Sequence, residues 1–91
     1  MGHTKFEDLS DLSDELNKVR TLIGLKENCP GIFYFKSKPF LHFHDKDGVR
    51  WADIRVNDEW LKLDIDFLAT KKEKSKFMKK VLDYHNALIN V

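Results

Sequence analysis

The spacing of hydrophobic residues changes twice along this chain, and this change constrains the fold more than any other feature. Near the N-terminus the spacing is three and four, which places one apolar stripe on a helix. That stripe consists of Leu9, Leu12, Leu16, Val19, Leu22 and Ile23. From Ile32 to Ile65 the period is two, as in β-strands. From Lys71 onward the helical period returns, so the chain should fold as a helix, a sheet and a second helix.

The ends of the two helices carry recognisable signals. We expect the first helix to run from about Ser10 to Lys26, because Pro30 disfavours helical geometry just beyond it. The second helix should begin near Lys71. Thr70 and Glu73 there form a T-x-x-E capping box, in which each residue satisfies a backbone N–H of the other.

Short turns divide the segment of period two into strands. Turn-forming residues stand at Ser37-Lys38, Asp45–Gly48 and Asn57-Asp58. The strands expected between them are Ile32–Lys36, Phe40–His44, Val49–Val56 and Trp60–Ile65. Because short connections join antiparallel neighbours, we predict a four-stranded antiparallel meander. The expected fold is α+β, in the order α-β-β-β-β-α, with both helices packed on one face of the sheet.

Length and composition limit the class of protein. Ninety-one residues fit one domain, residues 1–91, and we expect residues 1–8 to be flexible. The net charge of +1 makes nucleic acid a less favoured partner. No apolar run reaches signal-peptide length or the roughly 20 residues of a membrane span, so no membrane partner is expected. A single cysteine, Cys29, excludes an internal disulfide, and we expect a cytoplasmic protein.

Pairing across the predicted turns sorts the strand residues onto two faces. One face is apolar and suits a core: Ile32, Tyr34, Leu41, Phe43, Ala52, Ile54, Leu61, Leu63 and Ile65. The other face mixes aromatic, histidine and charged residues: Phe33, Phe35, Phe40, His42, His44, Trp51, Asp53, Arg55, Trp60, Lys62 and Asp64. A slip of one residue in the first hairpin would exchange Phe33 and Phe35 for Ile32 and Tyr34.

The mixed face is the first candidate for function. Aromatic residues and Arg are typical of the centres of protein interfaces. The predicted binding residues are Phe40, His42, His44, Trp51, Asp53, Arg55, Trp60 and Lys62. They favour a non-enzymatic binding module, either a homodimer or a partner of another protein. Two structural alternatives stay open: these side chains shield one another, or one helix covers each face of the sheet.

An enzyme centred on two histidines is the second hypothesis. His42 and His44 stand two apart on a strand and therefore point the same way, with Asp53 diagonal to His42. They are candidate ligands for a metal ion, but a metal needs three or four ligands, and we expect no cofactor. An acid–base pair of His42 and Asp53 would lack an obvious nucleophile, since Ser37 lies in a turn and Cys29 has no flanking base.

The last helix carries a concentration of lysines, which gives a third hypothesis. They are Lys71, Lys72, Lys74, Lys76, Lys79 and Lys80. A phosphate backbone could bind them, although a solvated helix face explains them more simply. His85 lies within the apolar stripe of that helix, and we expect it to be a partly buried core histidine.

One run of residues carries a resemblance. Lys38-Pro39-Phe40-Leu41-His42-Phe43-His44, followed by Gly48 and Ala52-Asp53, resembles a pattern in small uncharacterised bacterial proteins. The resemblance covers about the central third of the chain. It implies a bacterial protein of unknown function and assigns no catalytic residue.

Overall fold

The computed structural model describes residues 6–90 and confirms the α+β class. The expected flexible segment, residues 1–8, lies mostly outside this range, and Phe6 opens the first helical element. The elements are the 3₁₀ helix η1 (Phe6–Leu12), α1 (Ser13–Arg20), β1 (Leu25–Cys29), β2 (Ile32–Phe35), β3 (Lys38–Lys46), β4 (Val49–Val56), β5 (Glu59–Asp64) and α2 (Lys71–Ile89). No helix within residues 6–90 is long and apolar enough to cross a membrane.

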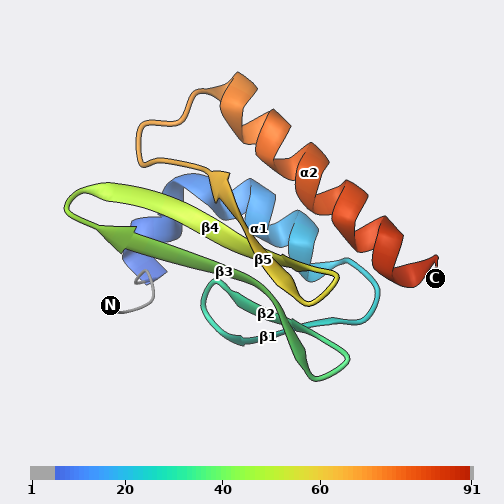
Figure 1. Ribbon diagram of the computed structural model, residues 1–91. Coiled ribbons are helices and arrows are strands. Elements are labelled where there is room, and N and C mark those ends of the chain that lie inside the picture. Colours follow the sequence, from blue (N-terminus) through green and yellow to red (C-terminus); the bar gives the residue numbers. More distant parts are fainter. Residues whose placement is uncertain (1–5, 91) are drawn as a thin grey trace.

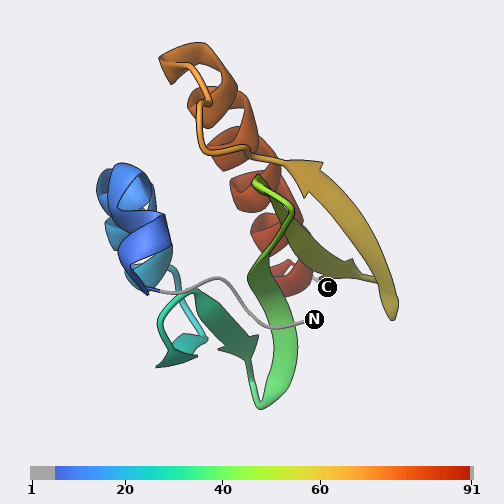
Figure 2. The same cartoon turned by 90° about the vertical axis from the view of Figure 1, so that its left-hand side faces the viewer.

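The strands form one antiparallel sheet in the order β1-β2-β3-β4-β5 (Figure 1). Figure 2 shows α1 and α2 on the same side of this curved sheet, as the sequence predicts. One core joins the helices to the sheet. Its members are Leu9, Leu12, Leu16, Val19, Phe33, Phe40, Leu41, Phe43, Ala52, Ile54, Leu63, Ile65, Phe77, Met78 and Val81. We call the sheet face that packs on the helices the inner face, and the opposite face the outer face.

The first helix is shorter than predicted, and a fifth strand follows it. α1 ends at Arg20, and β1 occupies residues expected to be the end of the helix and the loop after it. Gly24 lies between them with φ +82°, a conformation that favours glycine. A Cβ at Gly24 would lie 2.8 Å from the Phe35 ring, so the chain passes close to β2 as it enters β1.

The hairpin of β4 and β5 has the predicted register. Arg55 lies opposite Trp60 and Asp53 opposite Lys62. Its two-residue turn, Asn57-Asp58, has φ values of 52° and 66°. The hairpin of β3 and β4 also has a two-residue turn, which replaces the predicted four-residue turn. His44 therefore lies opposite Trp51, a shift of two residues that keeps every side chain on its predicted face.

The first hairpin differs from the prediction by a change of face. Its turn is Lys36-Ser37, so Phe33 lies opposite Leu41 and Tyr34 opposite Pro39. Phe40 is the extra residue of a β-bulge, and both Phe40 and Leu41 are buried. The prediction that Phe33, Phe35 and Phe40 lie on the mixed face was therefore wrong. Phe33 and Phe40 are core residues, and Phe35 packs against the core.

The last helix begins and packs as predicted. Thr70 Oγ1 accepts a hydrogen bond from the Glu73 N–H at 3.2 Å, and Glu73 Oε1 accepts one from the Thr70 N–H at 2.8 Å. His85 is buried, as expected, and its Nε2 donates to the carbonyl oxygen of Ile23 at 2.7 Å. This bond ties α2 to the turn between α1 and β1.

A buried arginine joins three separate segments. The guanidinium of Arg50 donates to the carbonyl oxygens of Asp8 at 2.8 Å, Ile65 at 2.7 Å and Asp66 at 2.9 Å. It also donates to both carboxylate oxygens of Asp11, at 2.7 and 2.9 Å. These bonds use all five N–H donors of a guanidinium. Arg50 therefore fixes η1 and the loop before α2 to the start of β4.

Candidate functional site: the outer face of the sheet

Four rings form a continuous row across the outer face. The His42 ring centroid lies 4.5 Å from that of Trp60 and 5.3 Å from that of His44. The His44 centroid lies 5.7 Å from that of Trp51. The two histidines come from the middle of β3, and the tryptophans come from β4 and β5. We call these four residues the ring row.

The row forms because strand alternation and register bring its members to one face. His42 and His44 are two apart on β3, and His44 lies directly opposite Trp51 on β4. Trp60 enters from β5, where its backbone lies opposite Arg55. The Trp60 side chain is 42% exposed, whereas the side chains of His42, His44 and Trp51 are half-buried. The row therefore ends in solvent at Trp60.

Charged groups surround the row. Asp53 Oδ2 lies 3.1 Å from His44 Nε2, and the same nitrogen lies 3.3 Å from His42 Nδ1. Because a carboxylate only accepts hydrogen bonds, this geometry favours the proton on His44 Nε2, with His42 Nδ1 as an acceptor. The Lys62 ammonium lies 5.3 Å from the centre of the Trp51 ring, within the range of a cation–π contact.

Arg55 makes a different contact from the one its register suggests. It lies opposite Trp60, but its Nη2 pairs with Asp58 Oδ1 at 3.1 Å across the turn. Asp53, opposite Lys62, lies against His44. Arg55 and Asp53 therefore contact residues other than the ones that lie directly opposite them in the β4–β5 register.

Seven of the predicted binding residues share the outer face, and Phe40 does not. The seven are His42, His44, Trp51, Asp53, Arg55, Trp60 and Lys62. Phe40 is 1% exposed in the core, where its ring and the His85 ring make an edge-to-face contact with 6.4 Å between centroids. The β-bulge at Phe40 is the physical reason for this correction, because it turns the aromatic side chain to the inner face.

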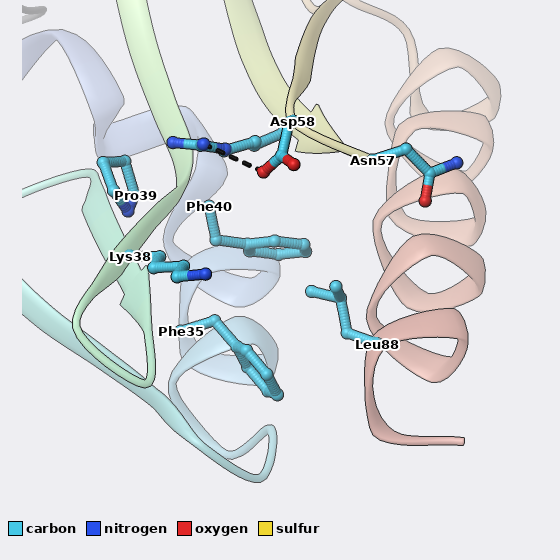
Figure 3. A pocket seen from close by; sticks show the side chains of 8 residues that line it. Phe35, Lys38, Pro39, Phe40, Asn57, Asp58 and Leu88 are labelled. Carbon is cyan, nitrogen blue, oxygen red and sulfur yellow. Dashed lines mark hydrogen bonds and ion pairs between the residues drawn. The ribbon is translucent and has the colours of Figure 1, made fainter. Parts of the chain in front are cut away.

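A small pocket lies between the first hairpin, the turn of β4 and β5, and the C-terminal end of α2 (Figure 3). Its volume is about 170 Å³, below the roughly 300 Å³ at which drug-sized ligand sites begin. Phe35, Phe40 and Leu88 form its apolar wall (Figure 3), and Lys38 and Arg55 are charged residues that also line it. Sequence reasoning missed this pocket because it depends on the bulge and on the packing of α2.

The ring row and its neighbour Asp53 bring together three groups that can share protons, His42, His44 and the Asp53 carboxylate. Within residues 6–90, no group of three or more His, Cys, Asp or Glu residues is arranged to hold a metal ion. Cys29 is exposed on β1, an edge strand separated from β3 by β2. Ser37 lies in the turn of the first hairpin. Neither nucleophile belongs to β3, the strand that carries both His42 and His44.

No protein-family model, curated protein or solved structure matches the chain.

Proposed function

We propose that this chain is a non-enzymatic binding module that self-associates through the outer face of its sheet. The observation that carries this proposal is the ring row, which ends in the exposed side chain of Trp60 while both helices lie on the inner face. Tryptophan is among the residues that contribute most to protein interfaces, because burying its ring removes a large apolar area from water.

The charges around the row favour a second copy as the partner. The outward-facing charged residues of β4 and β5 are Asp53, Arg55, Lys62 and Asp64, two of each sign. A two-fold interface places the same surface on both sides, so each surface must complement itself. A face with balanced charges can do this, whereas a face of one sign would repel its copy.

A dilution series followed by NMR tests the proposal. We expect the backbone amides of the outer face and the indole N–H signals of Trp51 and Trp60 to shift with protein concentration. Trp60→Ala should abolish these shifts, because it removes the exposed end of the row. Leu68→Ala is the matched control: Leu68 is 92% exposed but lies in the loop after β5, so the shifts should persist. Concentration-dependent shifts that survive Trp60→Ala would contradict the proposal.

The enzyme hypothesis has a separate test. A zinc titration should leave the ring signals of His42 and His44 unchanged, because no third ligand within residues 6–90 completes a site with them. Saturable shifts of both rings at equimolar zinc would contradict this prediction and favour the metal-dependent alternative.

A further inference from the structure

The two edges of the sheet differ in how well they can accept another strand. The edge strand β1 has a register shift between Glu27 and Cys29, and Pro30 follows it directly. Bulges and prolines are the devices by which proteins prevent strands from adding to an edge. The other edge strand, β5, pairs with β4 in an unbroken register over six residues. Only β5 therefore offers a regular edge within the described sheet.

The register shows which backbone groups of β5 point outward. Asn57-Asp58 is a two-residue turn with positive φ at both positions, so the flanking pair Val56 and Glu59 is hydrogen-bonded. Hydrogen-bonded and non-bonded pairs then alternate along the hairpin. Trp60, Lys62 and Asp64 fall at non-bonded pairs. Their N–H and C=O groups face away from β4, where no strand within residues 6–90 pairs with them.

A groove between β5 and α2 runs beside these groups. Its volume is about 230 Å³, and Lys62 and Leu63 line it from the strand. Lys76, Phe77 and Lys80 line it from the helix, and both lysines are exposed. The groove also contains Asp64 and Glu73. The Glu73 carboxylate is already engaged, because it accepts the N–H of Thr70 at the helix cap.

The side of this groove formed by α2 carries Lys76 and Lys80, and their positive charge favours an acidic partner. Two copies joined through their β5 edges would bring Lys76 and Lys80 of both molecules together, which like-charge repulsion opposes. A strand with carboxylates at alternate positions would instead place them all on one side. We propose that the β5 edge binds an extended acidic segment of a partner protein as a sixth strand, with its carboxylates facing Lys76 and Lys80. This site uses the strand edge, so it is distinct from the outer face proposed for self-association.

The experiment uses a capped eight-residue peptide of alternating Val and Glu, and the same peptide with Lys in place of Glu. We expect only the Glu peptide to shift the amide signals of β5. It should also slow the hydrogen exchange of the Trp60, Lys62 and Asp64 amides by about tenfold or more. Lys76→Glu combined with Lys80→Glu should weaken binding by about tenfold or more, and added salt should weaken it as well.

Two substitutions at Lys62 distinguish the contribution of its backbone N–H to peptide binding from that of its side chain. Lys62→Pro removes an outward N–H and no bond of the β4–β5 ladder, so the domain should still fold but lose peptide binding. Lys62→Ala removes the side chain and keeps that N–H, so it should weaken binding by only about threefold. Equal binding by these two variants would overturn the proposal. Binding of the Lys peptide would also overturn it. The exchange measurement on the unmodified chain tests the proposal even if Lys62→Pro fails to fold.

Discussion

Replacing the buried Arg50 should lower the stability of this domain more than any change on the outer face. Arg50 is 1% exposed, and its five N–H donors bond to η1 and to the loop before α2. The ring of Phe67 lies 4.9 Å from its guanidinium carbon. Arg50→Ala removes every one of these contacts and leaves their acceptors in place.

The magnitude follows from the groups that lose their donors. The carbonyl oxygens of Asp8, Ile65 and Asp66 each lose a hydrogen bond, and an unsatisfied buried acceptor costs about 1–3 kcal/mol. The lower value applies here, because the space left by Arg50 can admit water. The carboxylate of Asp11 is 34% exposed, so water can solvate it when Arg50 is removed. The loss of its two hydrogen bonds from Arg50 therefore adds little to the cost. We expect Arg50→Ala to lower the free energy of unfolding by about 3–4 kcal/mol, which is about 1 kcal/mol for each of the three carbonyl oxygens and a small addition for Asp11.

Denaturant unfolding followed by tryptophan fluorescence and circular dichroism measures this loss. Arg50→Lys provides the matched comparison, because it keeps the charge but supplies three donors in place of five. Its loss should be intermediate, about 2 kcal/mol. A loss below about 1 kcal/mol for Arg50→Ala would refute the reasoning, because it would mean that the bonds contribute nothing that water cannot replace.

Two further predictions concern the acid dependence of unfolding and the glycine at position 31. The hydrogen bond from Arg50 holds the pKa of Asp11 below its ordinary value of 3.8, so its stabilising effect is complete above that pH and is lost as the pH falls through the lower, folded-state pKa. Asp11→Asn should therefore reduce the acid dependence of unfolding below pH 4, and an unchanged acid profile would contradict this. Gly31→Ala should destabilise the domain by about 2–4 kcal/mol, because φ is +77° and the new Cβ would lie 2.6 Å from Leu9 Cδ1. Gly48→Ala is its control: φ is +79° there with no atom within 4 Å of the new Cβ, so its loss should be about 1–2 kcal/mol, and equal losses would refute the steric argument.

Three parts of the fold that local sequence determines were predicted correctly. The capping box at Thr70 and Glu73 depends on residues three apart, and the structure contains both of its hydrogen bonds. The register of β4 and β5 depends on a two-residue turn, whose residues Asn57 and Asp58 tolerate positive φ. The apolar stripe of α2 is a third local pattern, and Phe77 is among the core residues it supplies.

The errors arose where tertiary packing overrides a local pattern. Leu22 continues the spacing of the first helix, but Gly24 turns the chain and β1 pairs with β2. Phe40 belongs to an alternating run, but the bulge moves it to the core, where the space between the sheet and α2 accommodates its ring. Arg50 shares the inner face with Ala52. A cation at an inner-face position was the available signal that the core contains a buried arginine, which pairs with the partly exposed Asp11.

Sedimentation equilibrium over a wide range of protein concentration tests the central claim, that the outer face of the sheet is a self-association surface. We predict that the chain passes from monomer to dimer as its concentration rises, that Leu68→Ala does the same, and that Trp60→Ala stays monomeric while remaining folded. A chain that stays monomeric up to about 1 mM, where the free energy of association would be weaker than about −4 kcal/mol, would contradict the claim. A Trp60→Ala variant that dimerises as strongly as the unmodified chain would contradict it equally.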